Sequence, residues 1–411
     1  MASLNSKVDL AKQCIPDSSH GVKRSLSDFE TQLLSDDSDE ILERHRSKKK
    51  GSDSEYRENV SRPEENSGSY FLENIKKNTS EWTAMILPNF QIKFDSDTYA
   101  SEDYDVFTKG ILHFIEKATC SEIFNLFLKG RKEDKEKYEC FQYALLEVFD
   151  IDCCHIDDID NEDIQILNQK IEDCHWIDTY IAKTDCNQRL VRRICDRELC
   201  TTLNMFMWQL LHMHRKQKEN RLKKLSKGMY QELFVSFARI FGLNIVSGSN
   251  VEEYSITIKE NDFVATPDAI ICHPSAFDSD KIFAVITVKQ DQDEDNDQVE
   301  NLSKKQKKSH EDHICSSLKG QHCGQFLCTL PFSVFGNRGM YGFVVQETNV
   351  TLTCFKPDDG YYEDSCNGCL REKEAVVTFS KQYNILRKKD RRQLVDMFLD
   401  FEKLLKFLSV K

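Results

Sequence analysis

The sequence predicts an α/β fold for the C-terminal half of the chain, from about Tyr230 onward. Three observations indicate this class. Short apolar runs of strand length recur after Gly228, a helical segment separates the fourth run from the fifth, and an amphipathic helix closes the chain. This order of strands and helices is typical of a mixed central sheet that is flanked by helices.

Polar or turn-forming residues bound each predicted strand. The predicted strands are Leu243 to Ser247, Tyr254 to Ile258, Ala269 to Cys272, Ile282 to Val288, Tyr341 to Val345 and Val350 to Phe355. The helix before them ends at Gly242, because glycine commonly terminates helices. A second helix is predicted from Cys315 to Thr329, and the closing helix has apolar residues at helical spacing from Leu394 to Leu408. Between the fourth strand and the second helix, Gln290 to Asp312 is rich in Asp, Gln, Asn and Lys, which predicts a flexible insertion within the domain 228–411.

The preceding region, 81–227, is predicted to form a helical domain. Apolar residues recur at helical spacing from Val106 to Ile115 and from Tyr138 to Phe149. A longer helix is predicted from near Arg189 into a basic tract, Arg215 to Lys227. The domain carries no recognisable catalytic motif, so we expect it to present the basic tract, and a protein partner is possible there.

Residues 1–80 are predicted to be a disordered tail, because they are polar and charged and have few side chains that can form a core. Ser35 to Glu40 is typical of a target for an acid-directed kinase. Arg44 to Lys50 is typical of a nuclear localisation signal, with an ordinary solvated run as the alternative. No apolar run has the length of a membrane span and no signal peptide is evident, so we expect an intracellular protein without a membrane partner, with the nucleus slightly favoured over the cytoplasm.

Charge and cysteine content narrow the classes of protein. The net charge of −13 disfavours non-specific binding of nucleic acid over the whole surface, although basic residues cluster in the tract and again from Arg387 to Arg392. Sixteen cysteines in a chain without an export signal predict reduced thiols. Cys366 and Cys369 have the spacing of half a zinc site, but a convincing second half is absent, so we do not expect structural zinc.

Four short motifs carry chemistry that is relevant to phosphodiesters. They are Tyr230-Gln231-Glu232, Thr266-Pro267-Asp268, Thr287-Val288-Lys289 and Gln321-His322-Cys323-Gly324-Gln325. Positions 287 and 289 share one face of a strand, so Lys289 is expected to point into a cleft beside Asp268. Glu232 reaches toward this cleft from the helix, and Gln321 and Gln325 lie on one helical face. Read separately, Asp268 is a turn residue, Lys289 a solvated strand end and Glu232 a complement to the helix dipole.

The order of these motifs resembles the PD-(D/E)XK nuclease superfamily, which has the restriction-endonuclease-like fold, over roughly residues 228–355. The resemblance implies that Glu232 and Asp268 bind Mg²⁺ and that Glu232, Asp268 and Lys289 form the catalytic set. The cation would activate water and neutralise developing charge. Lysines of the basic tract and two glutamines would contact the nucleic acid. These predicted substrate-binding residues are Lys223, Lys224, Lys227, Gln321 and Gln325.

One position departs from the family. The chain has Thr287 where the family has Asp or Glu, and a neutral hydroxyl is a poor Mg²⁺ ligand. Three consequences remain open at this point. The carboxylate comes from Glu232, Asp291 or Glu311; the domain binds metal weakly and cleaves slowly; or it is an inactive pseudonuclease that binds nucleic acid or protein. In each case Thr287 is expected to face the cleft rather than the core.

Overall fold

A computed structural model describes residues 72, 74–95, 103–116, 119–126, 135–172, 197–219, 224–273, 281–289, 314–370 and 373–410. All of them belong to one compact unit, Glu64–Lys411, and the boundary predicted between 227 and 228 falls inside this unit. The predicted kinase target, localisation signal and flexible insertion lie outside the described residues.

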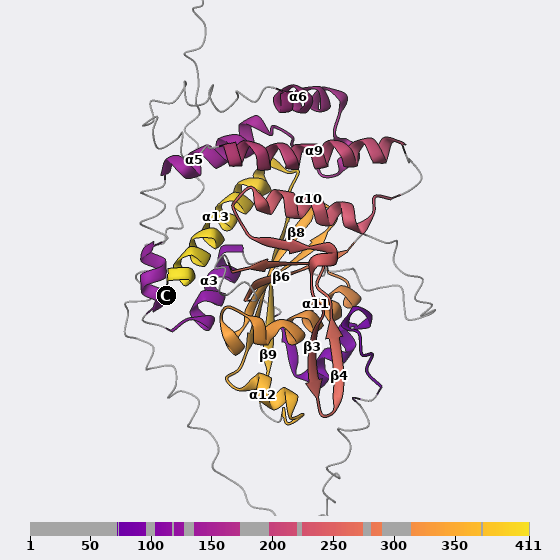
Figure 1. Ribbon diagram of the computed structural model, residues 1–411, viewed down its shortest axis with the longest axis vertical. Helices are drawn as coiled ribbons and strands as arrows, with labels where there is room; N and C mark the ends of the chain where they lie inside the picture. Colours follow the sequence, from indigo (N-terminus) through magenta and orange to yellow (C-terminus); the bar gives the residue numbers. More distant parts are fainter. Residues whose placement is uncertain are drawn as a thin grey trace, which may run out of the picture. The chain divides into compact units, whose positions relative to one another are not determined.

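A mixed seven-stranded sheet has the order β1-β9-β8-β7-β6-β5-β2. Figure 1 labels β6, β8 and β9 of this sheet. Its strands are β1 (Ile92–Phe94), β2 (Ile245–Ser247), β5 (Ala269–Cys272), β6 (Ile282–Lys289), β7 (Met340–Gln346), β8 (Asn349–Pro357) and β9 (Ala375–Asn384). The pairs β1–β9 and β6–β7 are parallel, and the other neighbouring pairs are antiparallel. A separate hairpin joins β3 (Tyr254–Ile258) to β4 (Asn261–Ala265). The predicted class, a mixed sheet flanked by helices, is confirmed.

The described α-helices lie on both sides of the chain's midpoint. They are α3 (Asp103–Phe114), α5 (Lys135–Tyr143), α6 (Asn161–Glu172), α9 (Arg197–Glu219), α10 (Lys227–Arg239), α11 (Ser316–Thr329), α12 (Tyr361–Cys366) and α13 (Lys388–Val410). The predicted long helix does not continue through the basic tract. Residues 224–226 are not helical, and α10 begins afresh at Lys227.

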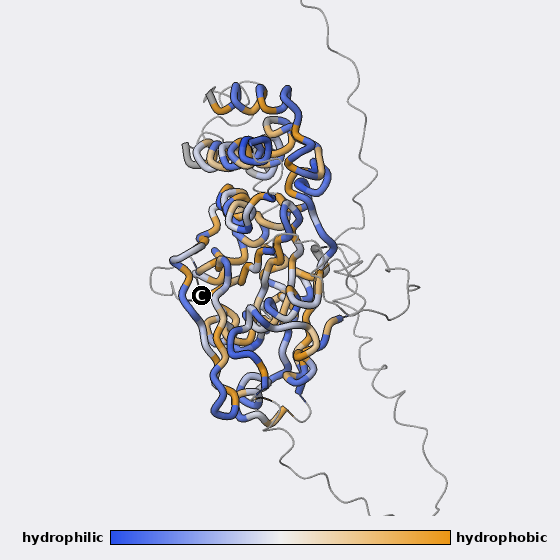
Figure 2. The backbone as a smooth tube through the Cα atoms, turned by 90° about the vertical axis from the view of Figure 1, so that its right-hand side faces the viewer, coloured by the Kyte–Doolittle hydropathy of each residue, from blue (hydrophilic) through white to orange (hydrophobic). Residues whose placement is uncertain are grey.

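The sheet separates two hydrophobic cores, and β6 contributes to both. Ile286 and Val288 lie in the core that includes side chains of α3, α9, α10 and α13, whereas Val285 lies in the core beneath α11. Figure 2 shows hydrophobic stretches gathered in the interior of this unit. Because β6 is covered on both faces, seven of its eight residues are buried, as expected of a central strand.

The segment before β1 is packed rather than disordered. Thr79 is buried, and the Trp82 ring stacks on Phe90 at 4.9 Å and meets the edge of Phe263 at 5.5 Å. Close approach to α11 requires a glycine, because a Cβ on Gly320 would lie 2.5 Å from the Thr83 backbone. The tail predicted to extend to residue 80 therefore gives way to packed structure by residue 74.

The second basic patch predicted near the C-terminus is not a surface patch throughout. Arg391 is fully buried and donates hydrogen bonds to five backbone carbonyls, three of them between residues 145 and 151. Burial lowers the pKa of its guanidinium to about 10. Arg391 therefore ties the start of α13 to the segment after α5 and is not part of an exposed basic patch. No described helix is long and apolar enough to cross a membrane.

Candidate functional site

Asp268 and Lys289 lie at the same edge of the sheet. β5 and β6 are antiparallel, so the start of β5 lies beside the end of β6. The amide of Asp268 donates to the carbonyl of Ile286 at 3.1 Å, and Lys289 is the last residue of β6. The N-termini of α10 and α11 contribute to this edge through Lys227 and Cys315. We call these residues, with Ser317, the strand-end site.

Both carboxylate oxygens of Asp268 already have partners. Oδ1 forms an ion pair of 2.6 Å with Nζ of Lys227 in the first turn of α10, and Oδ2 accepts a hydrogen bond of 2.7 Å from the amide of Val288. The Asp268 side chain is 14% exposed and that of Lys227 is 43% exposed. The ammonium group of Lys227 therefore neutralises the carboxylate that the family resemblance assigns to a metal ion.

The side chain that reaches from α10 toward Asp268 belongs to Gln231 and not to Glu232. Gln231 is buried, and its Nε2 donates to the Asp268 carbonyl at 2.6 Å. Glu232 is exposed, because successive helical residues point about 100° apart. The structure therefore does not bring the predicted ligand Glu232 together with Asp268.

Thr287 lies in the interior beneath α11, so the expectation that it faces an open cleft is wrong. Its side chain is fully buried, and its hydroxyl donates to Oε1 of Gln325 at 2.5 Å. The Thr287 hydroxyl oxygen also lies 2.6 Å from Nδ1 of His322. Nε2 of His322 in turn lies 2.7 Å from the hydroxyl of Thr353. We call these four side chains the buried network.

The donor and acceptor of each hydrogen bond in the buried network follow from where the Thr287 hydroxyl sends its single proton. Since that proton goes to Gln325, Thr287 must accept from His322, which places a proton on Nδ1. Nε2 is then an acceptor, and Thr353 donates to it. Complete burial lowers the pKa of His322 to about 3, so the imidazole is neutral at physiological pH. The network is uncharged throughout.

Gly342 on β7 makes room for the buried network. A Cβ at this position would lie 2.7 Å from the ring of Phe326 and from the hydroxyl of Thr353, and 2.8 Å from the ring of His322. These distances are shorter than van der Waals contact, so any larger residue would push α11 side chains away from the sheet. The sequence signal for this region was the helical motif itself, in which His322 and Gln325 are three residues apart and share a face.

Lys289 projects to the same side of β6 as Thr287, but it reaches the start of α11. Its Nζ lies 3.0 Å from Sγ of Cys315 and 3.0 Å from Oγ of Ser317. Burial raises the pKa of the Cys315 thiol, but the hydrogen bonds from Lys289 and Ser317 outweigh this effect and lower the pKa overall. Lys289 and Asp268 thus share an edge of the sheet but bind different helices.

The remaining predicted binding residues are dispersed. Gln325 is buried within the network and Gln321 is half-buried one turn before it, so Gln325 is not available to a substrate. Lys224 is exposed, whereas Lys223 lies outside the described residues. Of the described residues predicted to bind substrate, Lys227 is the one that belongs to the strand-end site.

The residues present do not fit a Mg²⁺ site. Mg²⁺ requires several oxygen ligands in near-octahedral geometry. Asp268 is paired with Lys227, Thr287 belongs to a neutral buried network, and Glu232 is exposed elsewhere on α10. Within the described ranges, no three or more His, Cys, Asp or Glu side chains are grouped as metal ligands. Asp291 and Glu311, the other candidate acids, lie outside the described residues.

The electrostatics of the strand-end site favour an anion. Lys227 begins α10, and the ammonium group of Lys289 contacts the first turn of α11. Backbone amides carry partial positive charge at both of these helix ends. One carboxylate, that of Asp268, offsets part of this charge.

In the comparisons with known proteins, no family model, no curated protein and no solved structure matches this chain.

Proposed function

We propose that this chain is a PD-(D/E)XK-like pseudonuclease that binds nucleic acid at the strand-end site and does not cleave it by the metal-dependent route. The order of elements supports the restriction-endonuclease-like core. Helix α10 is followed by antiparallel β2, β5 and β6, and α11 then connects β6 to the parallel strand β7. This is the order in which the family's motifs occur along the sequence.

The burial of Thr287 is the observation that carries the proposal. A nuclease site needs a carboxylate at this position that is open to the cation and to water. Here the position lies in the interior, where a neutral imidazole and an amide use its hydroxyl. Replacing the hydroxyl by an anion would leave an unpaired buried charge, which proteins rarely tolerate. The fold therefore supports binding better than hydrolysis.

Lys227 and Lys289 supply the positive charge that binding requires. Lys227 is 43% exposed, and both ammonium groups stand where helix N-termini already favour an anion. Contacts of this kind recognise the phosphate backbone and carry little base specificity. The alternative function, a Mg²⁺-dependent nuclease, requires a carboxylate from residues 290–313 to reach Asp268.

Equilibrium binding in the presence of EDTA tests the proposal. We would titrate labelled single- and double-stranded DNA and RNA with wild type, with Lys227→Gln/Lys289→Gln, and with a control of equal charge change, Lys77→Gln/Lys109→Gln. Lys77 and Lys109 are exposed, the first before β1 and the second on α3. We expect the first double variant to bind about tenfold more weakly and to lower the salt slope by about two, and the control to stay within about twofold of wild type.

Two results would overturn the proposal. One is equal weakening by both double variants, because binding would then reflect overall charge. The other is wild type that fails to bind any of the four nucleic acids in EDTA but cleaves one of them in Mg²⁺.

A further inference from the structure

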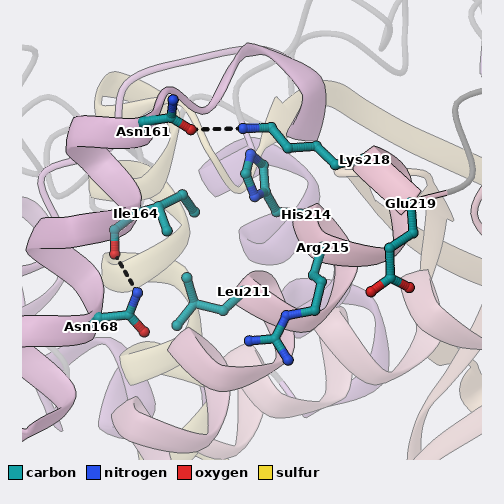
Figure 3. Close-up of a pocket in the computed structure, with 8 residues that line it drawn as sticks. All are labelled: Asn161, Ile164, Asn168, Leu211, His214, Arg215, Lys218 and Glu219. Carbon is teal, nitrogen blue, oxygen red and sulfur yellow. Dashed lines mark hydrogen bonds between the residues drawn. The ribbon is translucent and has the colours of Figure 1, made fainter.

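A pocket of about 390 Å³ lies between α6 and α9, on a part of the unit that the strand-end site does not use (Figure 3). Ile164 and Leu211 give it apolar walls, and Arg215 and Lys218 lie along its α9 side. Asn161 at the start of α6 binds Lys218 near the end of α9, so the two helices run in opposite directions along the pocket. Its volume is within the range of small-ligand sites.

Arg215 is the polar group in this pocket that is available to a ligand. Its side chain is exposed and forms no hydrogen bond or ion pair with the residues that the structure describes. Figure 3 shows its guanidinium group beside Leu211, facing the pocket. Nζ of Lys218 is held by Asn161 at 2.9 Å and keeps further hydrogen-bonding capacity.

Neighbouring acids do not neutralise Arg215. Glu219 pairs with Lys216 at 3.1 Å, and the carboxylate of Asp157 accepts from Gln217 at 3.1 Å. His214 is buried, with Nε2 3.2 Å from the carbonyl of Ile159, and burial lowers its pKa. The pocket thus combines apolar walls, a neutral imidazole, two cationic groups and one carboxylate, that of Glu219, which Lys216 offsets. This lining suits a ligand with a flat apolar part and an anionic part.

Trp208 extends this surface along α9. The residue is 54% exposed, which is unusual for the largest aromatic residue. Positions 208, 211 and 215 recur at helical spacing, so Trp208 continues the face that carries Leu211 and Arg215. An exposed indole on the same helical face as cationic groups can stack a base of a single strand while the cations bind its phosphates.

We infer that the α6–α9 pocket binds a nucleotide of single-stranded nucleic acid. The base enters between Ile164 and Leu211, the phosphate binds Arg215 and Lys218, and the neighbouring base stacks on Trp208. A duplex does not satisfy this site, because its bases are already paired and stacked. The inference rests on the proposed function, nucleic-acid binding, and specifies that the nucleic acid is single-stranded. It also assigns a second contact surface, which is remote in sequence from Asp268 and Lys289.

Binding to strands and duplexes of matched sequence tests the inference. The probes are an oligodeoxythymidine and an oligouridine of about 15 nucleotides, and the oligodeoxythymidine annealed to its complement. Trp208→Ala is compared with Met85→Ala, another exposed apolar residue, and Arg215→Gln with Lys109→Gln, an exposed lysine on α3 that does not line the pocket. We expect the two pocket variants to bind single strands at least about fivefold more weakly, and to bind duplex within about twofold of wild type, whereas the controls change neither.

Two outcomes overturn the inference, and they are distinguishable from failure of the proposed function. If Trp208→Ala and Arg215→Gln bind single strands like wild type while Lys227→Gln/Lys289→Gln is weakened, the pocket takes no nucleotide and the proposed function stands. If poly-glutamate displaces the strand, with dependence on Arg215 and none on Trp208, the pocket recognises acidic peptides instead. If wild type binds neither strand nor duplex, the proposed function itself fails.

Discussion

Thr287 and Lys289 are two residues apart on one face of β6, yet they lie in different chemical environments. Thr287 is fully buried among neutral partners on α11 and β8, whereas Lys289 reaches a partly exposed edge with charged side chains. A strand advances about 7 Å over two residues, which is enough here to pass from the interior to the edge of the sheet. Two residues whose side chains project from the same face of a strand therefore need not belong to the same site.

The same contrast separates what each region can do. The buried network fixes α11 on the sheet through hydrogen bonds that exclude water and charge. The strand-end site holds an ion pair and a lysine whose partners, among the residues that the structure describes, are a thiol and a hydroxyl. The first region stabilises the fold, and the second carries the charge that we propose binds nucleic acid.

Thr287→Glu should produce the largest effect, a loss of about 4 kcal/mol in the free energy of unfolding, because it buries an unpaired carboxylate in a neutral network. Urea denaturation with and without Mg²⁺ measures this loss. Thr287→Ser is the matched control, since it keeps the hydroxyl that His322 and Gln325 use. A Thr287→Glu variant with the wild-type midpoint and a Mg²⁺-dependent increase in stability would show instead that the position opens to a metal site.

Gly342→Ala should destabilise the protein by about 3 kcal/mol, because the added methyl group overlaps Phe326, His322 and Thr353. Gly228→Ala, where a Cβ meets nothing within 4 Å, provides the control and should be neutral or slightly stabilising. Thermal unfolding of the two variants makes the comparison. If the two variants have the same melting temperature, the region under α11 is loosely packed. It would then not differ from the strand-end site as a tightly packed interior region.

Acid should destabilise the protein through His322. The unfolded imidazole has a pKa of 6.5 and the folded one about 3, so the unfolded state binds more protons between these values. The free energy of unfolding therefore falls as the pH falls below 6.5, by about 1.4 kcal/mol per pH unit, or about 2 kcal/mol by pH 5. His322→Gln should lose this part of the slope, whereas His214, whose pKa is also lowered, keeps its own. An unchanged slope in His322→Gln would mean that His322 is not buried in the neutral form.

Asp268→Asn should have the smallest effect on stability, at most about 1 kcal/mol, because its partner Lys227 is 43% exposed and solvent weakens the pair. Nucleic acid should bind more tightly, since one negative charge is removed from beside Lys227. Filter binding in EDTA, with Asp358→Asn as a control that is remote in sequence, tests this. Weaker binding by Asp268→Asn would indicate that the carboxylate has a positive role, such as holding a cation.

The sequence predicted strands well where apolar runs were bounded by turns. Tyr254–Ile258 and Ala269–Cys272 agree residue for residue with β3 of the hairpin and β5 of the central sheet. β9 was not predicted, although it has ten residues, because Ala375–Asn384 mixes apolar, hydroxyl and charged side chains without clear alternation. β1 has three residues and forms a strand through pairing with β9, which is a tertiary effect.

The candidate site was predictable only in part. The order of motifs brought Asp268 and Lys289 to one edge, because strand direction follows from the sequence of elements. Three features depended on tertiary packing and had no local signal: the pairing of Lys227 with Asp268, the exposure of Glu232 in favour of Gln231, and the burial of Thr287 by α11. Such contacts depend on which side of a helix faces the site and on how deeply each strand residue is buried in the sheet. A short sequence motif specifies neither of these.

The most direct test of the central claim is incubation of the intact chain with single- and double-stranded DNA and RNA in Mg²⁺ and in Mn²⁺, with Asp268→Ala measured in parallel. If the strand-end site binds without catalysis, all four nucleic acids are recovered intact, and any trace of cleavage is equal in wild type and Asp268→Ala. Cleavage by wild type that Asp268→Ala abolishes would contradict the account, because it would require a metal site that includes Asp268 and a carboxylate from residues 290–313.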